Sequence, residues 1–241
     1  MRLAESAAAD VRNRAAGVVR IGAPLVLAGS VLPAAIREFC ELKPKVVVRI
    51  RDTAVDALVE SVATADLDLA VGPDRAVGES VIRETVFDSP WVLWCSPSHP
   101  LAARKVLRWS ELRDVPLVAA GRDHESSVAQ MHVNTPVNER LHTVDIVDNI
   151  STALGLAAEG LAVTLAPAYV GVLANKLGLV MRRVTQPEAI RQVCLYRPSG
   201  RAILPAAEAF AVFLVEWLRR WRKSTPVASG GFSARDPDPA S

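Results

Sequence analysis

The segment GVVRIGAPLVLAGSVLPAAIREF, residues 17–39, contains the pattern that decides the fold. Residues 18–22 form a short β-branched run that ends in glycine, which is typical of a buried strand. After a loop that contains Pro24, Ser30 precedes apolar residues at helical spacing. The segment therefore predicts a strand, a loop and a helix.

The same strand and helix unit repeats along the chain. Residues 46–50 are predicted as a second buried strand, Asp52 and Thr53 as the start of a second helix, and residues 67–72 as a third strand. Strands that alternate with helices imply parallel strands joined by right-handed crossovers. We therefore expect an α/β sheet that is covered by helices on both faces.

A second series of elements follows residues 91–95, WVLWC, which are apolar on both faces and predict a strand that passes between two lobes. Further strands are predicted at 117–120, 143–147 and 162–166, and helices at 126–137 and 149–159. Residues 192–196 resemble 91–95 in character and predict a second crossing, followed by an amphipathic helix at 205–222. The predicted fold class is α/β, with two Rossmann-like lobes joined by two crossover strands.

These elements define the predicted domains. Lobe I comprises residues 17–91 and 194–223, and lobe II comprises residues 92–193. The Ala-rich residues 1–16 predict an exposed helix or the remnant of a longer one. Residues 224–241 are expected to be a disordered tail, because their Pro, Gly, Ser and Asp content does not support a core.

Composition narrows the class of protein. The 241 residues carry 28 Lys and Arg against 26 Asp and Glu, and this near balance does not suggest a surface built to neutralise phosphates. Cys40, Cys95 and Cys194 are too far apart for a disulfide framework or a zinc ribbon and fit a reducing compartment. The charged N-terminus is unlike an export signal, and the longest uncharged run, residues 160–174, is too short to span a membrane. We therefore expect a cytoplasmic protein without a membrane anchor.

The carboxyl ends of the predicted strands are the expected place for a ligand, as in other open α/β sheets. At these ends, free N–H groups at helix starts favour an anion, and hydroxyl groups can donate hydrogen bonds to it. Because Ser and Thr are also ordinary helix caps, capping alone is the alternative interpretation. The candidate ligand-binding residues are Leu27, Gly29, Ser30, Asp52, Thr53, Ser126, Ser127, Asn149, Ser151 and Thr152.

Other polar and aromatic residues have two interpretations each. Arg49 and Arg51 could supply a cation to the ligand, but outward-facing edge charge is the favoured interpretation. His99 is favoured as a turn residue over a catalytic base. Trp91 and Trp94 are favoured as core packing over cleft lining.

The remaining candidates give little sign of chemistry. Cys95 and Cys194 fall in the two crossings and are predicted to be neighbours in space, as buried packing rather than a redox pair. The basic end of the last helix complements the helix dipole and is expected to stay solvated. The His, Asp and Glu residues between 123 and 142 lack the spacing of zinc motifs, and no nucleophile and base occur at recognisable spacing. We therefore expect no metal, no cofactor and no catalysis.

Four segments of the chain form a recognisable series: residues 17–22 leading to 30–33, the ADLDLAVG of 65–72, the SHPLA of 98–102 with 109–118, and the LAAEGLAVTLAP of 156–167. Taken in this order, they resemble the effector-binding domain of LysR-type transcriptional regulators. The resemblance covers residues 17–222 and implies the type 2 periplasmic-binding-protein fold. It also implies that a small-molecule effector binds in the cleft between the lobes and shifts a hinge.

The resemblance further implies how the signal is used. The family assembles as homodimers or homotetramers, with the apolar side of residues 31–42 as the candidate contact surface. The family's N-terminal winged helix-turn-helix is absent from this sequence, so operator DNA is expected to be contacted only through that missing domain, and residues 1–16 resemble the end of the linker helix. The alternative functions are a solute-binding protein of a transport system with the same fold, and an enzyme, for which the required acid, base or nucleophile cluster is not seen.

Overall fold

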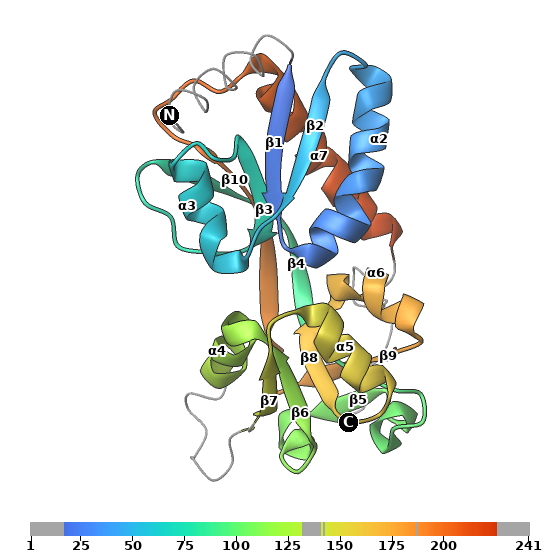
Figure 1. Ribbon diagram of the computed structural model, residues 1–241. Helices are drawn as coiled ribbons and strands as arrows, with labels where there is room; N and C mark the ends of the chain where they lie inside the picture. Colours follow the sequence, from blue (N-terminus) through green and yellow to red (C-terminus); the bar gives the residue numbers. More distant parts are fainter. Residues whose placement is uncertain (1–16, 132–140, 142, 187, 226–241) are drawn as a thin grey trace. The chain divides into compact units, whose positions relative to one another are not determined.

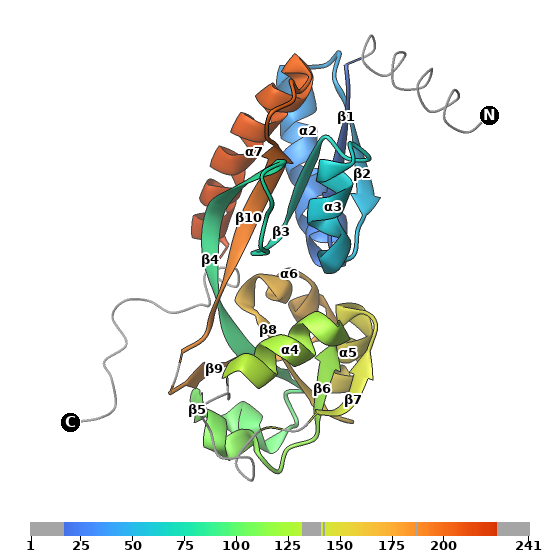
Figure 2. The same ribbon diagram turned by 90° about the vertical axis from the view of Figure 1, so that its left-hand side faces the viewer.

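The computed structural model describes residues 17–131, 141, 143–186 and 188–225 (Figures 1 and 2). Two compact units are present: unit 1 is Met1–Phe87 with Gln192–Arg220, and unit 2 is Asp88–Arg191 with Trp221–Ser241. Strands β4 (Val81–Cys95) and β10 (Ile190–Pro198) have residues in both units, which confirms the predicted pair of crossover strands. The predicted domain limits at residues 91 and 194 stay a prediction, and residues 1–16 and 226–241 lie outside the described part.

The sheet of unit 1 has three parallel strands. Strand β1 (Val18–Ala23) lies between β2 (Val47–Asp52) and β3 (Leu69–Pro73), and β10 is antiparallel to β3. Helix α3 (Leu58–Ala63) lies on one side of these strands and α2 (Leu32–Leu42) on the other (Figure 1). Because β1, β2 and β3 are parallel, their carboxyl ends share one edge, where a ligand is expected.

The first helix begins earlier than the sequence predicts. The chain is helical from Leu25, and residues Leu27–Val31 form a π-helical turn that continues into α2. The Ala28 N–H donates to the Pro24 carbonyl at 2.9 Å, so the first turn closes directly after the proline, a residue that favours helix starts. The predicted loop before Ser30 is therefore wrong, because buried Leu27, Ala28 and Val31 already pack as helical core.

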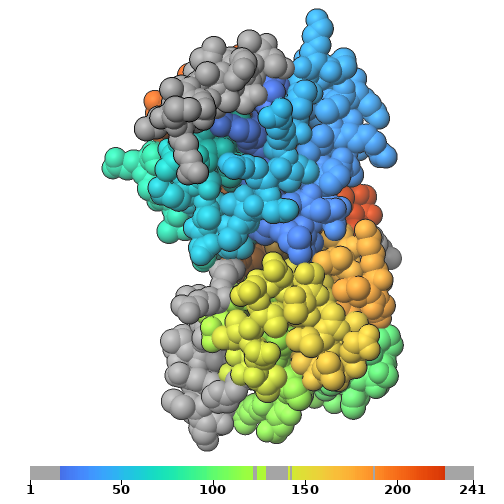
Figure 3. Space-filling view, in the orientation of Figure 1, coloured from blue at the N-terminus to red at the C-terminus, as the bar shows by residue number. Residues whose placement is uncertain are grey.

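Helix α7 (Pro205–Ser224) covers α2. The Phe39 ring centroid lies 4.9 Å from that of Phe210 and 5.2 Å from that of Phe213. Val31, Leu32 and Phe39 are consequently buried within unit 1, and of the apolar side chains in α2 only Leu42 is fully exposed. Most of the apolar side of residues 31–42 is thus buried within unit 1, and the use of this helix as a contact surface between copies of the chain stays a prediction. Figure 3 shows the outer surface of α2 beside that of β2.

Unit 2 contains a second set of parallel strands. Strand β6 (Leu117–Ala120) lies between β7 (Thr143–Val147) and β8 (Val163–Pro167), and β4 is antiparallel to β8. The bounds predicted for β6 and β7 are confirmed. Helix α5 (Ile150–Ala158) follows β7. Elements that were not predicted are β5 (Val106–Arg108), β9 (Val180–Thr185), α6 (Gly171–Ala174) and the 3₁₀ turns Val55–Ala57, Pro100–Ala103, Trp109–Leu112, Ala168–Val170 and Asn175–Leu177.

Helix α4 (Gly121–Met131) does not match the predicted helix at 126–137. It begins directly after β6, because Gly121 has a φ of 76° that lets the chain turn from strand to helix without a loop. The polar residues 122–125, which were predicted as loop, form the first turn of the helix. Residues 132–137 of the predicted helix lie outside the described part of the chain.

Ala65 occupies a backbone conformation that disfavours alanine. It follows the C-cap of α3 and has a φ of 66°, in the left-handed region that costs a side-chain-bearing residue about 1–2 kcal/mol. Glycine adopts this conformation freely but loses about 0.5–1 kcal/mol in backbone entropy. We expect Ala65→Gly to raise the free energy of unfolding by about 0.5–1 kcal/mol in denaturant titrations. Ala63→Gly, within α3, is the control and should lower the free energy of unfolding by about 0.8–1 kcal/mol. A lower free energy of unfolding in both variants would contradict the prediction.

Candidate functional site

In unit 1, the carboxyl ends of β1 and β2 are joined by backbone pairing. The Thr53 N–H donates to the Ala23 carbonyl at 3.0 Å, and its hydroxyl donates to the Arg51 carbonyl at 3.0 Å. A Cβ atom on Gly22 would lie only 2.9 Å from Thr53 Oγ1 and 2.3 Å from Leu67 Cδ1. Glycine at this position therefore allows Thr53 to lie over the end of β1.

The predicted ligand-binding residues of unit 1 differ in exposure. Leu27 is buried and contributes packing, whereas Gly29 is exposed and has open space at its Cβ position. Asp52 is exposed at the end of β2. Ser30 is partly exposed but lies inside the π-helical turn, so its interpretation as a residue preceding the helix is wrong. The edge of unit 1 thus brings together residues 27–30, Asp52 and Thr53.

The turn Pro73–Arg75, at the end of β3, belongs to the same edge but was not among the predicted residues. A Cβ atom on Gly72 would lie 2.5 Å from Leu58 Cδ1 and 3.3 Å from Pro24 Cδ, so β3 ends in close contact with the start of the first helix. Residues at the ends of β1 and β2 were chosen because they follow the carboxyl end of a predicted strand. Residues 73–75 also follow a predicted strand, and this signal could have identified them.

Tyr196 on β10 holds this turn. Its hydroxyl donates to the Pro73 carbonyl and accepts a hydrogen bond from the Arg75 N–H at 2.8 Å. Tyr196 is fully buried, and burial, with a smaller effect of nearby Cys194, raises the pKa of the phenol above its usual range. The hydroxyl is therefore neutral near pH 7 and is able to donate and accept at the same time.

In unit 2, three of the predicted residues meet at the start of α5. Asn149 is the N-cap with an extended backbone, but its side chain makes no capping hydrogen bond. Ser151 and Thr152 lie in the first helical turn, and the Thr152 N–H donates to the Asn149 carbonyl at 3.1 Å. Ala120 pairs with Val147, so α4 and α5 both start at the carboxyl-end edge of this sheet. The N–H groups in the first turn of α5 are therefore not capped by the Asn149 side chain.

Ser126 and Ser127 lie within α4 rather than before it. Their interpretation as residues at a helix start is therefore wrong, because α4 begins at Gly121. Ser126 is exposed, whereas the Ser127 hydroxyl accepts a hydrogen bond from Arg191 Nη1 at 2.7 Å. Arg191 is only 8% exposed and was not predicted, because a single arginine beside an apolar strand has no distinctive sequence signal.

Several alternative interpretations are resolved. Arg49 and Arg51 are exposed on edge strand β2, as expected for outward-facing charge. His99 Nδ1 accepts a hydrogen bond from the Leu101 N–H at 3.2 Å, which confirms its role in a turn. Trp91 and Trp94 are 2% and 0% exposed, which confirms core packing.

The favoured interpretation of Cys95 and Cys194 as buried packing is confirmed, because both residues are fully buried and neither forms a disulfide. Cys194 lies in unit 1, with its sulfur 3.9 Å from Thr85 Oγ1, and Cys95 pairs with Val180 in unit 2; that the two thiols are neighbours in space stays a prediction. The expected solvation of the basic end of α7 is confirmed for Arg219 and Arg220, whose side chains are 49% and 68% exposed, although the arginines there also contact other parts of the chain. Arg219 Nη2 lies 3.2 Å from Glu84 Oε1, Arg220 Nη2 lies 3.7 Å from Glu38 Oε2, and Arg222 Nε donates to the Asp88 carbonyl at 2.9 Å.

Two other kinds of site are absent from the described residues. No three His, Cys, Asp or Glu side chains of the described chain lie close enough together to hold a metal ion. In the same residues, no helix combines the length and the apolar character that are needed to cross a membrane.

Two α/β units linked by crossover strands, each with polar groups at the carboxyl ends of its strands, define the class of type 2 periplasmic-binding-protein-like ligand-binding domains. A family model described as the LysR substrate binding domain matches residues 12–219. This chain therefore belongs to the family of LysR substrate-binding domains.

Known proteins support this assignment. The uncharacterized HTH-type transcriptional regulator YbhD of Escherichia coli is 26% identical over 187 residues, which is 76% of this chain and 58% of the relative. The effector-binding domain of QuiR in complex with shikimate has a TM-score of 0.72 at 14% identity and covers 85% of this chain and 98% of its own. The BenM effector-binding domain with its effector benzoate has a TM-score of 0.71 at 17% identity. This match covers 86% of this chain and 94% of the BenM domain. This chain thus spans little more than half of YbhD.

Proposed function

We propose that this chain is the effector-sensing domain of a LysR-type transcriptional regulator. The family match over residues 12–219 is the observation that carries this proposal. It favours a regulator over a transport protein of the same fold, because the relatives it matches have the names of transcriptional regulators.

The proposed effector is a small organic anion that binds at the carboxyl-end edges of the sheets. Two observations support an anion: the start of α5, whose N–H groups are not capped by the Asn149 side chain, and the buried guanidinium of Arg191 in unit 2. The Thr53 hydroxyl lies at the edge of unit 1 and donates to an effector when it turns away from the Arg51 carbonyl. The QuiR and BenM domains were solved with shikimate and benzoate, and both of these molecules are small carboxylates. They are therefore the first probes for this chain.

In the whole protein, the proposed effector shifts the equilibrium between open and closed forms of the domain. Such a shift typically corresponds to a coupling free energy of about 1–3 kcal/mol, which is enough to alter the geometry of an oligomer. We propose that the signal reaches helix-turn-helix domains through a homodimer or homotetramer. Operator DNA is then contacted by those domains and not by the residues described here.

The test is a thermal-shift screen with benzoate, shikimate and other small carboxylates. A ligand present at about 100 times its Kd is expected to add about 2.7 kcal/mol to the free energy of unfolding. For a confirmed ligand, Thr53→Ala should raise the Kd at least tenfold, because a hydrogen bond to a charged group contributes about 1.5–3 kcal/mol.

Thr64→Ala is the matched control, because this exposed threonine at the opposite end of α3 bonds only to Glu60 and Asp66. Its Kd should equal that of the unmodified chain. A flat response to every carboxylate would contradict an anionic effector, and equal affinities in both threonine variants would exclude Thr53 from the site.

A further inference from the structure

The turn after β3 is held at every backbone position from Pro73 to Arg75. The Pro73 carbonyl and the Arg75 N–H both bond to the hydroxyl of Tyr196. The Asp74 N–H donates to the Gln192 carbonyl at 3.0 Å, and Arg83 Nη1 donates to the Arg75 carbonyl at 2.8 Å. The Asp74 bond continues the antiparallel pairing of β3 with β10, in which Pro73 lies opposite Val193, and Tyr196 and Arg83 add side-chain hydrogen bonds where β3 ends.

This turn lies at the carboxyl-end edge of the unit 1 sheet, where the proposed effector is bound. It follows β3, and the pairing of Gly22 with Ala70 places it level with Pro24 and the start of the first helix. Gly72 is so close to Pro24 and Leu58 that a methyl group in its place would require both to move. The turn therefore lies on the same edge as Thr53 and residues 27–30, where the proposed effector is bound.

The charge at this turn also suits an anion. Arg75 belongs to the turn and Arg83 donates to it, whereas Asp74 is the one acidic residue within the turn itself. By residue type, the three residues of the turn and the arginine that donates to them carry two positive charges and one negative charge. A small carboxylate that approaches this edge is consequently attracted to the turn.

We propose that the turn Pro73–Arg75 forms part of the effector-binding edge of unit 1 and that Tyr196 is the positioning residue that holds it in place. This proposal rests on the proposed function, because it adds a third strand end to the same binding site. Tyr196 acts through the turn and does not itself touch the effector, since its side chain is fully buried.

The experiment compares Tyr196→Phe with the unmodified chain. Phenylalanine keeps the buried ring but removes the oxygen that bonds to Pro73 and Arg75. In hydrogen–deuterium exchange, the Arg75 amide should exchange at least tenfold faster, while the amides of β1 and β2 keep their protection. The Kd of the best carboxylate from the thermal-shift screen, measured by calorimetry well below the melting temperature, should rise at least fivefold.

Thr164→Val is the matched control for the loss of one buried hydroxyl. Thr164 donates to the Val118 carbonyl at 2.9 Å in unit 2, and valine has nearly the same shape. The control should lose stability without a change in Kd or in the exchange of Arg75. If Tyr196→Phe does not fold, Arg83→Gln at the exposed end of the network replaces it, with faster exchange of the Asp74 and Arg75 amides and weaker binding expected again.

The outcomes separate this proposal from the proposed function. Unchanged exchange at Arg75 would overturn the positioning role of Tyr196, whether or not a ligand is found. Faster exchange with an unchanged Kd would exclude the turn from the binding edge. If no carboxylate binds the unmodified chain, the anionic effector is rejected, and the exchange result alone decides whether Tyr196 holds the turn.

Discussion

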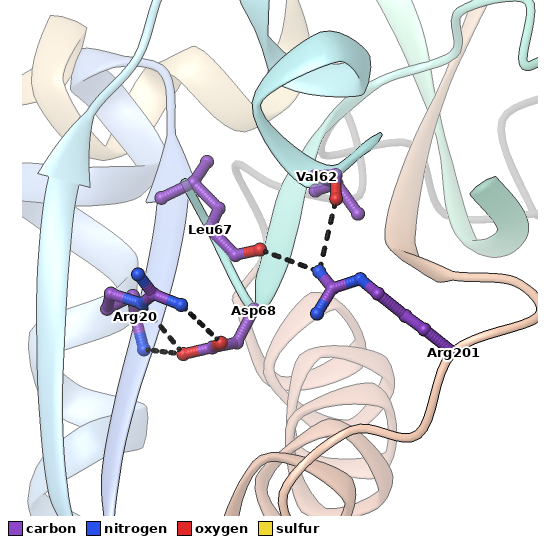
Figure 4. Close-up of polar contacts among 5 residues, drawn as sticks. All are labelled: Arg20, Val62, Leu67, Asp68 and Arg201. Carbon is purple, nitrogen blue, oxygen red and sulfur yellow. Dashed lines mark hydrogen bonds and ion pairs between the residues drawn. The ribbon is translucent and has the colours of Figure 1, made fainter. Parts of the chain in front are cut away.

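Asp68→Ala is expected to lower the free energy of unfolding of unit 1 by about 3–5 kcal/mol. The Asp68 carboxylate accepts hydrogen bonds from the backbone N–H of Arg20 at 2.8 Å and from its guanidinium at 2.9 and 3.2 Å (Figure 4). The Asp68 side chain is 9% exposed and that of Arg20 is 25% exposed. Removing the carboxylate leaves a largely buried cation and a backbone donor without their partner.

Hydrogen–deuterium exchange together with denaturant titration measures this loss unit by unit. Because the pair joins β1 to the start of β3, the amides of these two strands should lose protection before those of unit 2. Glu188→Gln is the control: Glu188 pairs with Arg183 at 2.6 Å, but both side chains are at least one third exposed, so about 0–1 kcal/mol is expected. Equal effects of the two variants would show that burial of the Asp68 pair contributes nothing.

Phe210→Ala is expected to destabilise unit 1 by about 3–5 kcal/mol, the usual range for a buried phenylalanine. Phe210 is fully buried in α7 and packs its ring at 4.9 Å from that of Phe39 in α2, so the truncation leaves a cavity between the two helices. The ring of Phe213 lies beside both of them and fills only part of the space.

Val212→Ala is the control on the same helix. Val212 is 57% exposed, and its replacement should change the free energy of unfolding by less than about 0.5 kcal/mol. Urea titrations followed by circular dichroism compare the two variants. A loss below 1 kcal/mol for Phe210→Ala would mean that α7 is not required to hold α2.

The local sequence pattern was sufficient to predict the bounds of strands whose residues strongly favour β-structure. The runs at 117–120 and 143–147 became β6 and β7 with the predicted bounds, because strongly apolar or β-branched residues between turn signals leave few alternatives. The same reasoning placed Thr53 and Asn149 at strand ends, where they are found. It failed at Ser30 and Ser126, because helices that start directly after Pro24 and Gly121 absorbed the polar residues predicted as loops.

The order and period of apolar segments were enough to predict the α/β class and the two crossings, and the family was inferred from the resemblance of four motif segments. That Phe210 covers α2 and that Tyr196 bonds to the turn after β3 became visible only in the folded chain. The second of these contacts joins residues 123 positions apart, and no local pattern encodes which distant side chain reaches a given backbone group. Packing of the whole unit makes that choice, because it selects the partner that fills the space and satisfies the buried polar atoms.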